Sequence, residues 1–127
     1  MVERKQSSYS YDKKFGVELV INTKRRYIDW SKTAKNLKLL RQDNINLRRY
    51  VCSQLYYGKR DCVADCAKCK FDMDHSISQA ELARVFNVSE SMMVNWENSK
   101  SRPQLDDLIF YSQICEIDLF DVIVFAD

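Results

Sequence analysis

Residues 77–103 contain the signals for two helices joined by a tight turn. Ser78 is followed three residues later by Glu81, which is the pattern of a capping box: the serine oxygen accepts the Glu81 amide hydrogen and the glutamate accepts the Ser78 amide hydrogen. A helix is therefore predicted to begin at Ser78. Asn87 tolerates the left-handed conformation and is predicted to end this helix, and Ser89 is predicted to cap a second one.

Apolar residues recur along both predicted helices at spacings that give each helix one buried face. Leu82, Ala83 and Phe86 share a face of the first helix, whereas Met93 and Trp96 share a face of the second. Four residues near the start of the second helix are left to face outward: Glu90, Ser91, Met92 and Asn95. A short polar helix start after a tight turn is typical of the DNA-reading helix of a helix-turn-helix, which enters the major groove.

The same stretch, ISQAELARVFNVSESMMVNWENSKSRP, resembles the helix-turn-helix of the Cro/phage-repressor (Xre-type) regulators. The positions that match the family pattern SQxELAxxxGVSxxxIxxWExGxxxP are Ser78-Gln79, Glu81-Leu82-Ala83, Val88-Ser89, Met93, Trp96-Glu97 and Pro103. Asn87 and Ser99 stand where the family usually has glycine, but both residues can still turn. With one helix upstream and two downstream, the resemblance covers roughly half to two-thirds of the chain.

The resemblance implies an all-α, repressor-like domain of five helices that binds double-stranded DNA and regulates transcription, with a homodimer on a two-fold site. It implies that Gln79 and the loop from Asn98 to Arg102 contact phosphates, while the outward residues of the second helix face bases. The implied DNA-binding residues are Gln79, Ser89, Glu90, Ser91, Met92, Asn95, Asn98, Lys100 and Arg102. A protein-interaction module on the same fold, such as an antitoxin or a regulatory adaptor, is the alternative.

Charge is distributed unevenly along the chain. Residues 1–60 hold 15 Lys and Arg against 5 Asp and Glu, whereas residues 61–127 hold 5 against 13, so a net charge of +10 precedes one of −8. Attraction for phosphate must therefore come mainly from the first half. The acidic second half, which includes Glu90 on the outward face, favours the interaction-module alternative.

Length and composition restrict the class of protein. The 127 residues, 46% of them apolar, suit one domain with a substantial core. A cytoplasmic protein without a membrane partner is expected, because no apolar run could span a bilayer, residues 1–5 do not lead into a signal peptide, and five cysteines fit a reducing compartment. His75 has no serine or carboxylate partner at an interpretable spacing, so an enzyme is not predicted.

Two segments precede the central stretch. Residues 1–28 are interpreted as a polar arm with a small β-hairpin that contributes to dimerisation, because Phe15–Ile21 is rich in β-formers and Asn22-Thr23 could return the chain through Lys24–Trp30. Residues 29–127 form the helix-turn-helix domain. Its first helix, capped by Asp29 or Ser31, is predicted to place Ala34, Leu37 and Leu40 inward and Lys32, Lys35, Lys38 and Arg41 outward.

Residues 46–76 are interpreted as a cysteine-rich insertion between this first helix and the one at Ser78. Leu47 to Tyr57 has helical spacing, so the first helix either continues or restarts after Asp43-Asn44. Four thiols could form a tetrahedral zinc site, with His75 as a substitute for the first: Cys52, Cys62, Cys66 and Cys69. An iron–sulfur cluster is less favoured than zinc, and reduced cysteines packed as small apolar residues are the alternative without metal.

Two helices are predicted after Pro103. The first has Leu105, Leu108 and Ile109 on an apolar face that continues toward Tyr111 to Ile114, and it buries Cys115 as a plain hydrophobe. The second is a short helix from Leu119 to Phe125 that closes the core.

Overall fold

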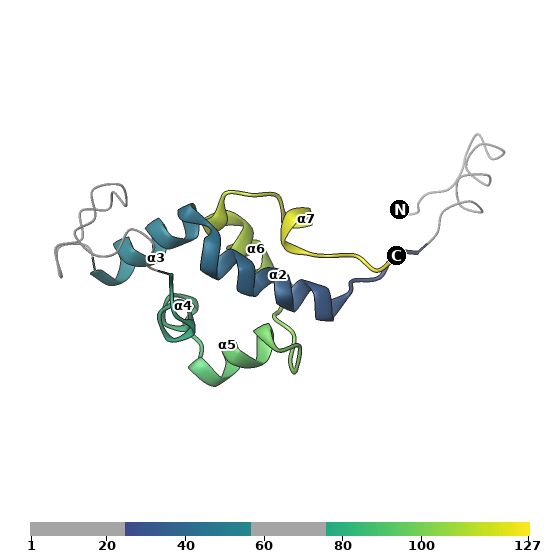
Figure 1. Cartoon of the computed structure of the whole chain (residues 1–127), viewed down its shortest axis with the longest axis horizontal. Helices are drawn as coiled ribbons and strands as arrows, with labels where there is room; N and C mark the ends of the chain where they lie inside the picture. The colour runs from purple at the N-terminus through teal and green to yellow at the C-terminus, as the bar shows by residue number, and fades with distance from the viewer. Residues whose placement is uncertain (1–24, 57–75) are drawn as a thin grey trace, which may run out of the picture.

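The computed structural model describes residues 25–56 and 76–127, which fold into six helices around one core (Figure 1). The helices are α2 (Trp30–Asp43), α3 (Ile45–Tyr56), α4 (Gln79–Phe86), α5 (Glu90–Glu97), α6 (Leu105–Cys115) and α7 (Leu119–Val122). The all-α class is confirmed for these residues. Helix α3 lies within the predicted insertion and restarts after Asn44, which was one of the two predicted possibilities, and the other five helices are α2, α4, α5, α6 and α7. None of the described helices is long and apolar enough to cross a membrane.

Asn44 separates α2 from α3. Its backbone is extended, with φ −78° and ψ 118°, and its Oδ1 accepts a hydrogen bond from the Leu47 amide at 2.9 Å, so the chain stops one helix and starts the next. Leu47 and Val51 are fully buried, and α3 packs on α4 and α6. The first part of the predicted insertion is therefore a core helix, and its remainder, residues 57–75, lies outside the described residues.

The core collects apolar side chains from every helix, and it includes the predicted members Leu82, Ala83, Met93 and Trp96. Cys115 is fully buried, and burial raises the pKa of its thiol to about 12, so it is protonated at neutral pH and packs as a hydrophobe as predicted. The predicted face of α6 was partly wrong. Leu108, Tyr111 and Ile114 are buried as predicted, but Leu105 and Ile109 are 59% and 37% exposed.

The two ends of the described chain pair beside the start of α2 (Figure 1). The Asp29 amide donates to the Val124 carbonyl, and the Ala126 amide donates to the Tyr27 carbonyl, each at 2.8 Å. This pairing corrects two predictions. The last helix ends at Val122 instead of Phe125, because the β-branched and aromatic residues 123–125 are extended and pair with residues 27–29. Trp30, which was predicted to be the last residue of a strand, is the first residue of α2. The other predicted strand, 15–21, lies outside the described residues.

Asn87 makes the turn between α4 and α5 in the left-handed conformation, with φ 58° and ψ 43°. We expect Asn87→Val to destabilise the fold by about 1–2 kcal/mol, because a branched Cβ crowds the following carbonyl oxygen there. Asn87→Gly should leave the free energy of unfolding unchanged or slightly raised. Urea unfolding of the two variants provides the measurement, and equal midpoints would contradict the assignment of this turn.

Candidate nucleic-acid interface

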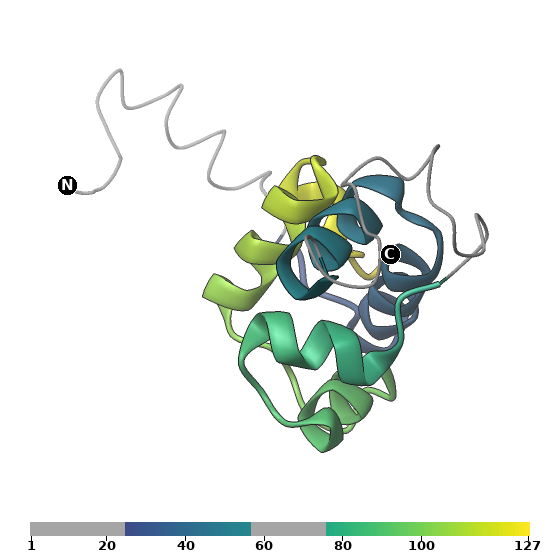
Figure 2. The ribbon, with the colours of Figure 1, turned by 90° about the vertical axis from the view of Figure 1, so that its left-hand side faces the viewer.

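Helices α4 and α5 form a capped pair, with α5 at the edge of the molecule in both ribbon views (Figures 1 and 2). The capping box at the start of α4 is confirmed: Ser78 Oγ accepts from the Glu81 amide at 3.0 Å, and Glu81 Oε1 accepts from the Ser78 amide at 2.9 Å. The cap of α5 is also confirmed, since Ser89 Oγ accepts from the Met92 amide at 3.0 Å. Local side chains thus accept from the Ser78 and Glu81 amides at the start of α4 and from the Met92 amide at the start of α5.

Packing against the core determines which side of α5 faces solvent. Met93 is fully buried, and Trp96 lies edge-on to Phe86 with ring centroids 5.8 Å apart. Ser89, Glu90, Ser91 and Met92 are consequently exposed on the first turn of α5, and the predicted outward residue Asn95 is half-buried at the border of this surface. We call Glu90, Ser91, Met92 and Asn95 the α5 surface.

A buried ion pair joins α5 to α2 and overturns one prediction. Arg41, expected to face solvent, is 8% exposed. Its Nε donates to Glu97 Oε2 at 2.8 Å, its Nη2 donates to Glu97 Oε1 at 3.0 Å, and its Nη1 donates to the Ile77 carbonyl at 2.7 Å. Arg41 points inward because it follows the buried Leu37 by four residues and so shares its face. The bidentate geometry satisfies both charges inside the protein.

Sequence reasoning missed the role of Glu97, whose side chain is almost fully buried. One signal in the sequence could have indicated this role: Glu97 directly follows the core residue Trp96 at the last position of α5. Gln79, predicted to contact phosphate, is half-buried, and its Nε2 donates to Glu97 Oε1 at 3.0 Å. Glu97, the last residue of α5, therefore joins this helix to the start of α4 through Gln79 and to α2 through Arg41.

The loop after α5 supplies the remaining predicted contacts. Ser99 has a φ of 62°, which confirms that this residue turns where glycine was expected. Asn98 and Lys100 are exposed. Arg102 is exposed too, and its guanidinium carbon lies 5.1 Å from the ring centroid of Trp30, so the loop lies against the start of α2.

Of the four predicted zinc ligands, only Cys52 lies within the residues that the structure describes. Cys52 lies on α3, half-buried and packed against the core. Cys62, Cys66, Cys69 and the substitute His75 fall outside the described ranges. Within residues 25–56 and 76–127 no three His, Cys, Asp or Glu side chains converge as a metal site.

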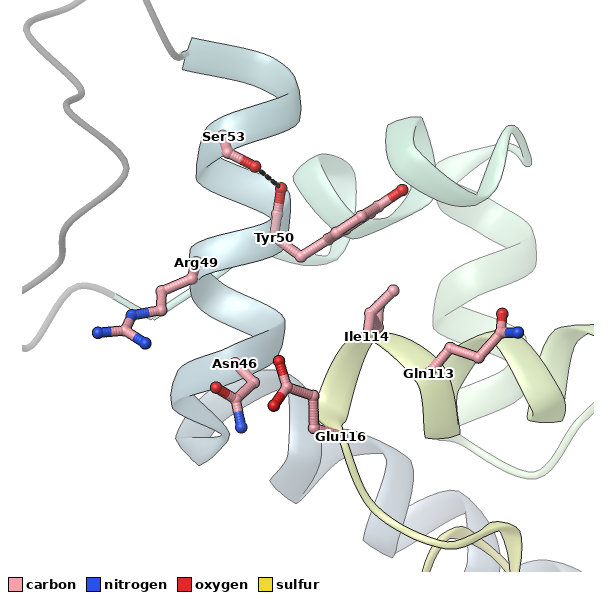
Figure 3. A pocket seen from close by; sticks show the side chains of 7 residues that line it. All are labelled: Asn46, Arg49, Tyr50, Ser53, Gln113, Ile114 and Glu116. Atoms are coloured by element: carbon pink, nitrogen blue, oxygen red, sulfur yellow. Dashed lines mark hydrogen bonds between the residues drawn. The ribbon is translucent and has the colours of Figure 1, made fainter.

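A shallow recess of about 270 Å³ lies between α3 and α6. Seven residues line it: Asn46, Arg49, Tyr50, Ser53, Gln113, Ile114 and Glu116 (Figure 3). Their side chains do not converge on one point, and Arg49 points away from the others. The Ser53 hydroxyl donates to the Tyr50 carbonyl at 2.8 Å, so no base activates it as a nucleophile in this arrangement.

Comparisons of the chain with protein-family models, with curated proteins and with solved structures found no match. A proposal about function therefore rests on the geometry of α4, α5 and the loop that follows them.

Proposed function

We propose that this chain binds double-stranded DNA in a sequence-specific manner and acts as a transcriptional regulator of the Xre/Cro type. The observation that supports the proposal best is the exposed first turn of α5, which follows the left-handed Asn87 and starts at the Ser89 cap. A helix start of this kind can enter the major groove, where base edges offer distinct donors and acceptors. The buried Arg41–Glu97 pair holds α5 in a fixed orientation for that role.

The side chains of the α5 surface suit base edges, whereas those of the following loop suit phosphates. Glu90 can accept a hydrogen bond from a cytosine amino group, and Asn95 can form two hydrogen bonds with adenine. Ser91 discriminates less, because a hydroxyl both donates and accepts. Exposed Lys100 carries a charge that attracts the backbone of any sequence. A homodimer would place two such helices on a two-fold operator.

We expect two substitutions in this region to have effects of different kinds. Asn95→Ala should relax the preference at one base pair and cost roughly 1–3 kcal/mol of discrimination, while Lys100→Ala should weaken binding to all sequences alike and leave the ranking of sequences intact. Competition binding against single-base operator variants measures both effects. If Asn95→Ala and the pair Glu90→Ala with Ser91→Ala all keep the wild-type base preference, α5 does not read DNA.

The alternative function, a protein-interaction module, is favoured by a separate observation. Leu105 and Ile109 lie one turn apart on α6 and expose 59% and 37% of their side chains, and Phe120 on α7 exposes 71%. Exposed apolar side chains that lie close together on helices commonly mark a protein–protein interface. A folded chain that binds no DNA sequence in preference to others would favour this alternative.

A further inference from the structure

Three arginines near the start of α2 lie on aromatic rings. The guanidinium carbon of Arg25 is 5.4 Å from the centroid of its neighbour Tyr27, and that of Arg26 is 4.1 Å from the centroid of Phe125 in the paired C-terminal segment. Arg102, in the loop after α5, lies over Trp30 as described above. We call these three residues the arginine strip. Its members come from two parts of the chain, and each is exposed.

Stacking prepares these arginines to bind an anion. A guanidinium group that lies on a ring keeps its in-plane N–H donors available, and its side chain loses less entropy on binding because it is already ordered. None of the three has an ion-pair partner among the described residues. The carboxylate nearest in sequence to Arg25 and Arg26, that of Asp29, accepts instead from the Lys32 amide at 2.9 Å as the cap of α2. Arg41, by contrast, already has a carboxylate partner.

The strip extends away from the α5 surface. Arg102 connects the loop after α5 to Trp30, the first residue of α2, and the extended segment 25–29 continues from that residue to the paired chain ends (Figure 1). Five extended residues span roughly 16 Å. Arg25 and Arg26 therefore lie beyond the phosphates within reach of Lys100, on opposite sides of this segment, because adjacent side chains of an extended chain alternate.

We propose that Arg25, Arg26 and Arg102 bind DNA phosphates beside the groove that α5 would occupy, so that DNA contacts extend from the α5 loop to the paired chain ends. This inference rests on the proposed function. The planar fork of arginine fits phosphate, because two N–H donors can meet two phosphate oxygens. Phosphate binding by these arginines would also give a role to the basic first half of the chain. The α5 surface itself carries no positive charge.

The test is the salt dependence of binding to a selected operator duplex, measured by fluorescence anisotropy over a series of KCl concentrations. The variant is Arg25→Gln with Arg26→Gln. Each phosphate contact contributes about 0.9 to the slope of log affinity against log salt, so losing two contacts should reduce the slope by about 1.8 for each protomer bound, or about 3.6 for a homodimer. Affinity should fall for every sequence while the ranking of single-base operator variants stays as in the wild type. Arg25→Lys with Arg26→Lys should retain most of the slope, because it keeps the charge.

The matched control is Lys32→Gln with Arg49→Gln, which removes the same charge elsewhere. Lys32 precedes Arg41 by nine residues, about two and a half turns, and so lies on the face of α2 opposite to the one that meets α5. Arg49 points away from the α3–α6 recess in Figure 3. An unchanged slope in the Arg25/Arg26 variant, or an equal fall in the control, overturns the inference.

Two further outcomes separate this inference from the function on which it rests. If the Arg25/Arg26 variant changes the oligomeric state in sedimentation but not the salt slope, the strip is a protein contact and the inference is wrong. If the wild-type chain binds all sequences equally and the variant still reduces the slope, the strip binds phosphate and it is the sequence-specific function that fails.

Discussion

Replacing Glu97 with alanine is expected to lower the free energy of unfolding by about 3–5 kcal/mol, because the substitution leaves the Arg41 guanidinium buried without its carboxylate. Gln79 would lose its acceptor at the same time. Since the stability of a domain is only about 5–15 kcal/mol, the loss should be plain in urea unfolding followed by circular dichroism.

The control for this variant is Glu90→Ala, which removes an exposed carboxylate from the same helix and should change stability by less than about 0.5 kcal/mol. Arg41→Met combined with Glu97→Leu should recover part of the loss, because two apolar side chains leave no unpaired charge in the interior. Equal stabilities of the Glu97→Ala and Glu90→Ala variants would show that α2 and α5 are not held together by this pair.

Trp96→Ala is the second substitution with a large expected effect. Its ring is 4% exposed and packs edge-on to Phe86, so truncation leaves a cavity between α4 and α5 and should cost about 3–5 kcal/mol. Met92→Ala, on the exposed side of the same helix, should cost less than about 0.5 kcal/mol. The shift of the urea midpoint measures both, and a Met92→Ala variant as unstable as Trp96→Ala would mean that the faces of α5 are assigned the wrong way round.

Local features of the chain could be predicted from sequence because their causes are local. Ser78, Ser89 and Asn87 act on backbone groups within three or four residues of themselves, and the structure shows each of them in its predicted role. The buried face of α5 followed from the spacing of Met93 and Trp96 in the same way. The candidate site could therefore be located from these residues alone, without knowledge of the rest of the fold.

Contacts between distant segments account for the predictions that were wrong. Arg41 was predicted to face outward with the lysines of its helix, but its buried partner Glu97 is 56 residues further along the chain and could not be read from local spacing. Residues 123–125 could have continued a helix, yet the pairing of the chain ends holds them extended. Leu105 and Ile109 looked like core residues because α6 is apolar on more than one side, and only packing decides which side is buried.

The central claim is that α5 reads DNA sequence, and selection from a pool of random double-stranded sequences tests it most directly. The account predicts that the wild-type chain enriches one motif, that the Asn95→Ala variant enriches the same motif with one position relaxed, and that the Lys100→Ala variant enriches it unchanged but less efficiently. A folded wild-type chain that enriches no motif over successive rounds would contradict the claim.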